Sequence, residues 1–236
     1  MKQEEIVKMF DDIASSYDKV NRVVSFGIDR KWREEAIKEV ISIKKPKKVL
    51  DVACGTGDMI EIWQKYGVEV CGIDPSVGML EVAKKRFQNV KFYNLRATNL
   101  QDIKDKCADT ISISFGIRNV VDINKAIKEF YRVLDNNGLV LILEFTKSKN
   151  PLRKIVDLYT NKVMPKIGGM LSKNEKAYKY LSSSIEKFYS ADELIFLFEK
   201  ENFKLLKKKS FNFGQVSLII LKKSGIIFKK YYKGIL

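Results

Sequence analysis

One short stretch constrains the fold of this chain more than any other, because it joins an apolar run to a glycine-rich turn. Residues 49–53 are apolar except for Asp51, and they lead into Cys54-Gly55-Thr56-Gly57-Asp58. A short apolar run that ends in turn residues is typical of a buried strand, and the residues after it favour a helix. Gly55 and Gly57 can adopt positive φ and leave the backbone open to a ligand. The stretch therefore predicts a strand, a tight loop and a helix at the ligand-binding edge of an α/β sheet.

The residues around this loop disfavour a phosphate ligand. A dinucleotide-binding loop needs a third glycine where this chain has Ile60, and an ATPase-type loop needs lysine where Asp58 follows Gly57. Asp51 and Asp58 would also repel phosphate, whereas they suit a ligand that carries an ammonium and a sulfonium group. The loop thus favours a charged nucleoside without phosphate, of which S-adenosylmethionine is the common one. An ordinary strand-turn-helix with glycines for packing is the alternative.

Further strands and helices alternate along the chain, as a parallel sheet requires. The strand predicted at 68–73 ends in Asp74, 19 residues after Gly55, where a carboxylate can accept hydrogen bonds from both ribose hydroxyls. The pattern predicts an α/β fold with a seven-stranded, mostly parallel, Rossmann-like sheet. Its strands are expected at 49–53, 68–73, 90–93, 110–115, 139–145, 204–211 and 216–222, and its helices at 59–66, 77–87, 123–134 and 191–200.

Two segments outside this alternation are predicted to be helical. Residues 1–45 form an arm over the sheet, interrupted at 18–27, after which Asp29 caps a second helix. The aromatic side chains of the arm either pack in the core or, in the case of Tyr17 and Phe26, roof a site. The second segment, residues 146–190, contains no strand pattern. It is either a packing excursion or an apolar-lined lid and substrate pocket.

The chain is long enough for one domain with a full core, since it has 236 residues of which 45% are hydrophobic. We expect this domain at 1–223 and a basic, aromatic tail at 224–236. Within residues 222–233, five lysines alternate with apolar and aromatic clusters, which predicts salt-sensitive attachment to an anionic membrane, with a solvated tail as the alternative. No apolar run approaches the ~18 residues of a membrane span, and the first residues are polar. A cytoplasmic location is expected, with peripheral contact at the inner membrane surface.

Histidine is absent from the sequence, which excludes several kinds of chemistry. Ser-His-Asp and Cys-His catalysis, histidine-ligated zinc and an imidazole base are all ruled out. Cys54, Cys71 and Cys107 lack the spacing of a metal site and are predicted to be reduced, buried thiols. No metal is therefore expected, and proton transfer must use carboxylates, tyrosine, water or the substrate.

The net charge of +15 is compatible with nucleic acid, anionic lipid or a lysine-rich genome. An RNA methyltransferase is the main competing function. The chain has no Asn/Asp-Pro-Pro-Tyr for base amino groups, no Pro-Cys nucleophile and no added RNA-binding module, so no nucleic-acid partner is expected. A noncatalytic scaffold is a further alternative, which the intact glycine loop disfavours.

Seven motifs spread along the chain point together to one family. They are Phe10-x-x-Ile13-Ala14-x-x-Tyr17-Asp18, the loop at 49–58, Gly72-Ile73-Asp74 with Met79-Leu80, the run from Ile113 to Asn119, Tyr131-Arg132-Val133-Leu134, Leu143-Glu144-Phe145, and Tyr178-x-Tyr180-Leu181. Over about residues 5–222 the chain resembles the menaquinone/ubiquinone-biosynthesis C-methyltransferases. The loop alone marks only a class I methyltransferase, and the other motifs are more specific.

The resemblance implies S-adenosylmethionine as cofactor and a prenylated quinol as substrate, either demethylmenaquinol or a ubiquinone precursor. It also implies a homodimer. Another lipid-linked small molecule, such as a phospholipid amine, is the alternative acceptor. By matched position, the cofactor contacts that the resemblance adds to Asp51, Gly55 and Gly57 are Thr56, Asp74, Arg96, Ala97 and Ser114.

Arg96 departs from the family pattern, which usually has Asp or Asn before the alanine to meet the adenine amino group. Arginine cannot accept a hydrogen bond, so we expect the adenine contact to move to the backbone or to Asn99. Two further departures, Gln101-Asp102 and Asn136-Asn137-Gly138, are expected to be peripheral to the chemistry.

Arg118 and Asn119 follow the strand predicted at 110–115 and are therefore expected at the ligand edge of the sheet. Methyl transfer to carbon requires an electron-rich ring, and removal of a phenolic proton, with a pKa of about 10, makes the ring electron-rich. Arg118 can stabilise the resulting phenolate, and Asn119 can bond to it. The proton would pass to water, Asp18 or Tyr17, because arginine is too basic to accept it. A surface-capping role for Arg118 and Asn119 is the alternative.

Overall fold

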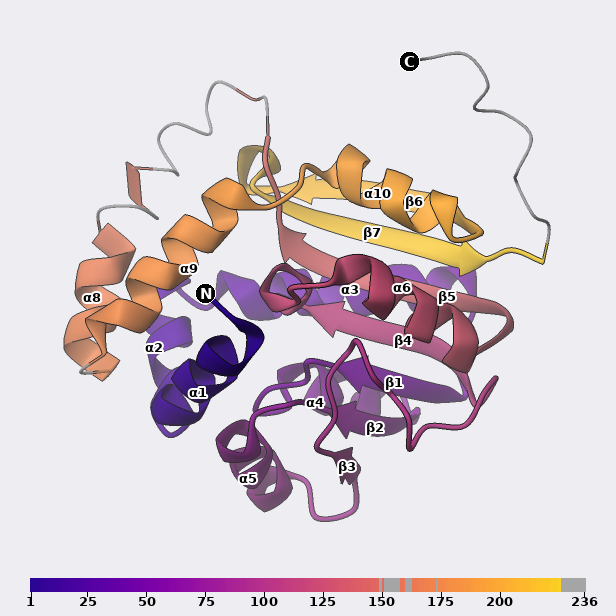
Figure 1. Ribbon diagram of the computed structural model, residues 1–236, viewed down its shortest axis with the longest axis horizontal. Helices are drawn as coiled ribbons and strands as arrows, with labels where there is room; N and C mark the ends of the chain where they lie inside the picture. The colour runs from indigo at the N-terminus through magenta and orange to yellow at the C-terminus, as the bar shows by residue number, and fades with distance from the viewer. Residues whose placement is uncertain (149, 151–157, 160–162, 173, 226–236) are drawn as a thin grey trace.

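Seven strands form one sheet in the order β3-β2-β1-β4-β5-β7-β6, as Figure 1 shows. The computed structural model describes residues 1–148, 150, 158–159, 163–172 and 174–225. The seven strands predicted from the sequence are confirmed, with ends that shift by one or two residues except in β5. They are β1 (Lys48–Val52), β2 (Glu69–Ile73), β3 (Lys91–Tyr93), β4 (Ala108–Ser114), β5 (Leu134–Phe145), β6 (Phe203–Phe211) and β7 (Val216–Lys223).

The first five strands are parallel to one another, and the last two run antiparallel to their neighbours. β1 lies between β2 and β4, with Leu50 beside Cys71 on one side and Ile111 on the other. β7 then pairs with both β5 and β6, so the final hairpin reaches the sheet through its second strand. Because parallel strands end at the same edge, the turns after β1, β2 and β4 meet there.

Helices cover both faces of the sheet, since residues along each strand alternate between the two faces. Leu50 and Val52 belong to the core beneath α6 and α10, whereas Val49 belongs to the core beneath α3 and α4. The largest side chains of these cores, Trp63 and Phe130, are fully buried. The helices are α1 (Gln3–Ile13), α2 (Tyr17–Val24), α3 (Ile28–Ile43), α4 (Asp58–Lys65), α5 (Val77–Arg86), α6 (Ile123–Val133), α8 (Met164–Ser172), α9 (Glu175–Lys187) and α10 (Ala191–Lys200), with short 3-10 turns η1 (Ile117–Asn119) and η3 (Asn212–Gly214).

The N-terminal arm is more helical than the sequence predicts. The interruption expected at 18–27 is wrong for most of its length, because α2 forms there and only Ser25–Gly27 turns the chain. α2 is stabilised by tertiary packing, since Val20 and Val24 are buried although its other residues are mostly polar. Gly27, with φ of 69°, stands at the N-cap of α3. Asp29 therefore lies in the first turn of α3, and the prediction that it caps the helix is wrong.

The connection between α6 and β5 differs from the prediction, which placed a helix at 123–134 and a strand at 139–145. α6 passes directly into β5, whose first residue, Leu134, lies opposite Ala108. The next pairing joins Thr110 to Leu139, so the residues from 135 to 138 form a bulge in a strand that begins earlier than expected.

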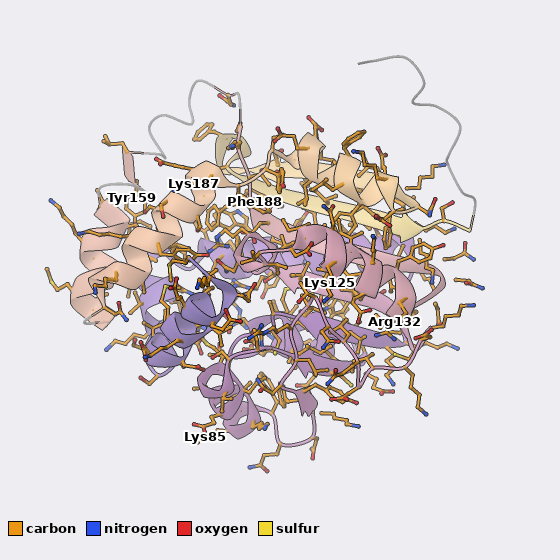
Figure 2. The ribbon with its side chains drawn as sticks, in the orientation of Figure 1. Lys85, Lys125, Arg132, Tyr159, Lys187 and Phe188 are labelled. Atoms are coloured by element: carbon orange, nitrogen blue, oxygen red, sulfur yellow. The ribbon has the colours of Figure 1, made fainter. Side chains whose placement is uncertain are left out.

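A third apolar cluster lies beyond the carboxyl edge of the sheet, where α1 and α2 meet the described part of the 146–190 insertion. Met9, Val20 and Val24 pack there with Met164 and Ala177. Figure 1 shows α1, α2, α8 and α9 gathered at this end of the molecule. Figure 2 labels Tyr159 at the same end.

Cysteines and membrane spans were also predicted from the sequence. Cys54 and Cys71 are buried free thiols, as predicted. Cys107 is a free thiol but only half-buried, because it lies in the turn before β4 rather than within a strand. In the described part of the chain, no helix is both long enough and apolar enough to cross a bilayer.

Candidate active site

The glycine loop between β1 and α4 is held in one conformation by backbone hydrogen bonds. Gly57 N–H donates to the Cys54 carbonyl at 2.9 Å, and Gly57 has φ of 95°. A Cβ atom at Gly57 would lie 2.6 Å from the Phe87 ring. Gly55 also has positive φ, with open space where a Cβ would stand. Glycine is required at Gly57 by both conformation and space, whereas Gly55 leaves room for a ligand.

Asp74 joins the end of β2 to this loop. Its carboxylate accepts hydrogen bonds from the backbone N–H groups of Gly55 and Ser76, each at 2.8 Å. The side chain is buried, and burial raises the pKa of Asp74 to about 6. Each carboxylate oxygen keeps a further lone pair, so the group can still accept hydrogen bonds from a ribose.

Asp51 is buried in the middle of β1 and is held by a chain of side chains. Trp63 Nε1 donates to Ser112 Oγ at 3.1 Å, and Ser112 Oγ donates to Asp51 Oδ1 at 2.6 Å. Asp51 Oδ2 is buried and has no partner among the described residues. Burial raises the pKa of Asp51 to about 7. The site therefore holds an acceptor that a cationic ligand group would satisfy.

The backbone is strained where β1 and β4 end. Ala53 and Phe115 both have φ of 54°, a conformation that residues other than glycine rarely adopt. Gly116 allows the two turns to approach, since a Cβ there would lie 2.5 Å from that of Ala53. The strained Phe115 carries its ring into the site described below.

A cavity of about 90 Å³, lined by both polar and apolar side chains, lies over the glycine loop. Side chains of α1 cover it, among them Gln3, Ile6 and Phe10. We call it the glycine-loop cavity. Seven of the eight residues predicted to bind the cofactor line it, and the eighth, Gly57, shapes the loop: the seven are Asp51, Gly55, Thr56, Asp74, Arg96, Ala97 and Ser114.

Arg96 lines the glycine-loop cavity, but its guanidinium forms an exposed ion pair with Glu4 of α1 at 3.0 Å. Asn99 does not line the cavity, and its amide donates to Gln101 at 3.1 Å. The expectation that Asn99 could replace the adenine contact therefore has no support from the geometry.

α1 is fastened over the cavity by polar contacts at both of its ends, which the sequence did not predict. Gln3 exchanges hydrogen bonds with the Asn119 carbonyl at 3.1 Å and with Val121 N–H at 3.0 Å. Asp11 accepts hydrogen bonds from Ser76 Oγ at 2.6 Å and from Gly78 N–H at 2.9 Å. A ligand of this cavity is thus enclosed between the sheet edge and α1.

Asp18 lies on the outer side of the glycine loop. Its carboxylate accepts a hydrogen bond from Thr56 Oγ1 and pairs with Arg86 at 3.1 Å. Arg86 also donates to the Thr56 carbonyl at 2.9 Å and pairs with Asp58 at 3.1 Å. Asp18 lines neither the glycine-loop cavity nor the larger, apolar cavity described next. The arrangement fits a role for Asp18 in holding the loop better than the predicted role in proton transfer.

A second cavity, of about 340 Å³, is lined mainly by apolar and aromatic side chains. We call it the apolar cavity. Phe10, Tyr17, Arg33 and Phe115 line both cavities, so the two adjoin at these residues. Its other lining residues include Met9, Ile13, Val24, Phe26, Ile28, Asp29, Trp32, Arg118, Phe145, Tyr159, Met164, Ala177, Tyr180 and Leu181.

Tyr17 stands in the shared wall, where it was predicted to relay a proton. Burial raises the pKa of Tyr17, which disfavours the tyrosinate form. Phe26 also lines the apolar cavity, and its ring contacts Tyr159 at 5.9 Å between centroids. Both residues thus border a cavity, in agreement with the roofing hypothesis.

Arg118 lines the apolar cavity, but its charge is already paired. It bonds to Glu144 Oε1 at 2.6 Å and to the Phe115 carbonyl at 2.8 Å, with side-chain exposures of 3% for Arg118 and 0% for Glu144. Burial raises the pKa of Glu144, and Arg118 opposes that rise. Asn119 accepts a hydrogen bond from Tyr180 at 3.2 Å. The two predicted residues are at the site, and Arg118 anchors its wall.

Sequence reasoning missed two charged residues of α3. Asp29 and Arg33 form an ion pair one turn apart, and both line the apolar cavity. Ser25 Oγ donates to Asp29 at 2.6 Å, and the Arg33 guanidinium lies 4.9 Å from the Phe115 ring centroid. Their spacing on the same helix face as Trp32 was the available signal, since charged residues there face the sheet.

Comparisons with known proteins agree with these features. A family model described as the ubiE/COQ5 methyltransferase family matches residues 1–223. Ubiquinone/menaquinone biosynthesis C-methyltransferase UbiE from Campylobacter jejuni is 47% identical over 233 residues, covering 94% of this chain and 99% of that protein. Demethylmenaquinone methyltransferase from Thermotoga maritima is 36% identical over 203 residues, covering 84% of this chain and 88% of that protein.

Solved structures also resemble this chain in fold. The crystal structure of a SAM-dependent methyltransferase from Thermotoga maritima matches with a TM-score of 0.63 and 20% sequence identity, covering 92% of this chain and 99% of that one. At this identity the match supports the fold alone.

Proposed function

This chain belongs to the ubiE/COQ5 methyltransferase family, and we propose that it transfers a methyl group from S-adenosylmethionine to a ring carbon of a prenylated quinol. The observation that carries the proposal is the pair of adjoining cavities. One lies over a glycine loop and carries the carboxylates of Asp51 and Asp74, and the other is larger and mainly apolar. The shared wall is where a methyl donor and an apolar acceptor would meet. Demethylmenaquinol, or a ubiquinone precursor, is the proposed acceptor.

The residues of the glycine-loop cavity fit the cofactor. The unpartnered Oδ2 of Asp51 suits a cationic group, Asp74 suits a ribose, and the open space at Gly55 admits a ligand. When bound, the cofactor supplies an activated methyl group on a sulfonium. Thr56, Arg96, Ala97 and Ser114 are proposed to complete its contacts.

The apolar cavity fits the ring and the start of a prenyl tail. Its volume of about 340 Å³ is at the lower end of the range for small-molecule sites. Phe10, Tyr17 and Phe115 would exclude water and align the acceptor carbon with the methyl group, which is largely a positioning task. Tyr180 lines this cavity and donates to Asn119. On substrate binding, this hydrogen bond could be exchanged for one to a ring oxygen.

The ion pair modifies the role proposed for Arg118. Because Glu144 neutralises its charge, Arg118 would support the ring oxygen through a hydrogen bond rather than as a free cation. Its Nε is buried without a partner among the described residues and is the donor proposed for this contact. The contact to the Phe115 carbonyl also fixes the strained turn. We assign Arg118 to this combined positioning and hydrogen-bonding task.

The proposal also includes peripheral contact of the protein with a membrane. Seven large apolar side chains are exposed on α2, on the turn that follows it and between residues 158 and 171: Val23, Phe26, Ile28, Leu158, Val163, Met170 and Leu171. α2 packs against α8, so these elements are neighbours beside the apolar cavity. Exposed basic side chains accompany them, among them Lys19, Arg22, Lys31 and Lys166. Such a surface suits an anionic bilayer that contains a prenylated substrate. We call it the apolar rim.

The proposed membrane contact does not rest on the predicted tail. Residues 226–236 lie outside the described residues. Lys223, one of the five lysines noted within residues 222–233, is the buried last residue of β7. Its Nζ donates to the carbonyls of Tyr131 and Leu134 at 2.6 and 2.7 Å.

The direct test is methyl transfer in vitro. Purified protein, labelled S-adenosylmethionine and a short-chain demethylmenaquinol should give a ring-methylated product by mass spectrometry. A phospholipid amine offered in parallel should stay unmethylated. Methylation of the amine, with no quinol product, would replace the proposed acceptor. In a deletion strain, accumulation of a demethylated quinone would name the cellular substrate.

A further inference from the structure

One carboxylate stands out in the apolar cavity. Among the described residues that line this cavity, Asp29 alone carries an acidic side chain. The side chain is 17% exposed, and its two oxygens accept hydrogen bonds from Ser25 and Arg33. Each oxygen keeps a lone pair for a further donor.

Arg33 links Asp29 to the place where the two cavities meet. It lines both cavities, is 7% exposed and stacks over the Phe115 ring. Its Nε is buried without a hydrogen-bond partner among the described residues. A buried donor of this kind is costly unless a ligand satisfies it. Arg33 is therefore ready to bind an anionic or strongly accepting oxygen.

The other candidates for a proton acceptor are less well placed. Asp18 is bound to Thr56 and Arg86 outside the apolar cavity. Glu144 is fully buried and paired with Arg118. Tyr17 has a raised pKa, which disfavours its basic form.

We infer that Asp29 accepts the ring hydroxyl proton during methyl transfer, and that Arg33 holds Asp29 and stabilises the negative charge on the ring oxygen. The inference rests on the proposed function and adds to it the two residues that activate the acceptor. Both belong to one turn of α3, so a rigid element presents them together.

The proton and electron balance of the step is closed. The ring O–H bond breaks and the proton passes to Asp29, so that electron density moves from the oxygen to the ring carbon. That carbon forms the new bond to the methyl group, and the carbon–sulfur bond breaks with its electrons left on sulfur. The ring carbon then loses its hydrogen as a proton, Asp29 returns its proton to the ring oxygen, and the aromatic quinol is restored. One proton per turnover leaves to solvent, and no oxidant or reductant is needed.

Several charged groups lie around Asp29. Arg33 lies one turn along α3, and Arg22, Arg30, Asp58 and Glu61 line a small hollow together with Asp29. Arg118 and Tyr17 line the same apolar cavity.

The test is steady-state methylation of a short-chain demethylmenaquinol by Asp29→Asn. We expect kcat to fall by about 100- to 1,000-fold, within the range for loss of a general base. The affinity of Asp29→Asn for S-adenosylmethionine should differ from that of the wild type by no more than about threefold. The deficit should shrink as pH rises towards about 10, where the ring hydroxyl ionises without help. Glu34→Gln, an exposed acid on the same helix, is the matched control and should behave as the wild type.

Two further variants distinguish a catalytic role of Asp29 from a purely structural one. Asp29→Asn leaves Arg33 without its ion partner, so its stability can fall. Asp29→Asn combined with Arg33→Gln removes both charges and should restore the melting temperature but not kcat. In Asp29→Ala, added formate should raise kcat by standing in for the missing carboxylate.

Three results would overturn the inference. The first is a kcat of Asp29→Asn within threefold of wild type. The second is a kcat deficit that stays constant with pH in Asp29→Asn and is unaffected by formate in Asp29→Ala, and the third is recovery of kcat in the double variant. A wild-type protein that methylates no quinol would instead overturn the proposed function, and this inference with it.

Discussion

At the scale of single residues, the site is built from charged groups that folding removes from water. Asp51 and Asp74 lie at the cofactor side, and Arg118 pairs with Glu144 at the acceptor side. Burial of a charge is unfavourable unless a partner compensates it. The two sides differ in this respect: the acceptor side carries its own counter-charge, whereas Asp51 has an oxygen that no described residue satisfies.

This difference predicts that cofactor affinity rises with pH. Burial raises the pKa of Asp51 to about 7 and that of Asp74 to about 6, so the empty site is protonated below these values. A cationic ligand favours the ionised carboxylates, and binding below pH 6–7 must therefore release protons, with affinity changing by up to about tenfold per pH unit for each proton. Calorimetric titration should give weaker S-adenosylmethionine binding at about pH 5.5 than at about pH 8.

Asp51→Asn provides the control, because it should flatten the pH dependence near pH 7. For the empty protein the sign is opposite: the raised pKa of Asp51 contributes stability that is fully present below its ordinary value of 3.8 and is lost as pH rises through about 7. Equal affinity at the two pH values would show that neither carboxylate is protonated in the empty site.

A second prediction at this scale concerns Arg118. Arg118→Met leaves Glu144 as an unpaired buried charge, which costs about 3–5 kcal/mol, or about 6–20 °C in Tm for a chain of this size. Adding Glu144→Leu should recover most of that loss, since the pair is then replaced by apolar groups. Scanning calorimetry on the single and double variants measures both effects. A single variant as stable as wild type would mean that Glu144 is already neutral in the folded protein.

At the scale of elements, α1 acts as a cover for the glycine-loop cavity. Its apolar side chains, such as Ile6, lie against the cavity, and the contacts of Gln3 and Asp11 fasten its two ends. Asp11 also accepts from Gly78 N–H in the first turn of α5, so it connects α1 to the element that follows Asp74. We therefore expect α1 to move when the cofactor enters or leaves.

The third prediction follows from this fastening. Asp11→Ala removes the acceptor of two hydrogen bonds and leaves their donors partly buried, a loss of about 1–3 kcal/mol. The dissociation rate of S-adenosylmethionine should rise by roughly 5- to 100-fold, while the association rate changes little. Stopped-flow fluorescence with competitor measures the rate. Asp12→Ala, an exposed neighbour on the same helix, should leave it unchanged, and equal rates for both variants would show that α1 does not limit release.

At the scale of the whole molecule, the two cavities and the apolar rim lie at the same end of the sheet. α2 contributes to all three, since Tyr17 borders both cavities and Val23 is exposed at the rim. The sheet supplies the rigid edge, and the helices beyond it supply the enclosure (Figure 1). A prenylated acceptor could then enter the apolar cavity while its tail remains in the bilayer.

The fourth prediction tests this arrangement by co-sedimentation with liposomes. The full chain should pellet with anionic vesicles more than with neutral ones, and less at high salt. Phe26→Ser combined with Met170→Ser should reduce pelleting, because these side chains are 76% and 81% exposed at the rim. Leu206→Ser, exposed on the edge strand β6, is the control. A chain ending at Gly225 tests the tail separately, and loss of pelleting in that chain alone would assign the contact to the tail.

The strands and most of the residues that line the glycine-loop cavity were predictable from the sequence, because both depend on local patterns. An apolar run followed by glycines at alternate positions specifies a strand and a turn within ten residues, and Asp74 follows at the end of the next strand. The lining of the glycine-loop cavity by Asp51, Thr56 and Asp74 follows from the rule that parallel strands end at one edge.

Only the tertiary structure decided which charged groups face the acceptor. Asp18 and Asp29 both lie in the polar part of the arm, yet Asp18 bonds to the glycine loop and Asp29 borders the apolar cavity. The choice depends on how α2 and α3 pack on the sheet. The helical spacing of Asp29 with Trp32 indicates only that Asp29 faces the sheet, not which cavity it borders. The pairing of Arg118 with Glu144, 26 residues away in the sequence, has the same origin. A motif selects the type of side chain at a position, whereas its partner is selected by whichever strand or helix folding places beside it.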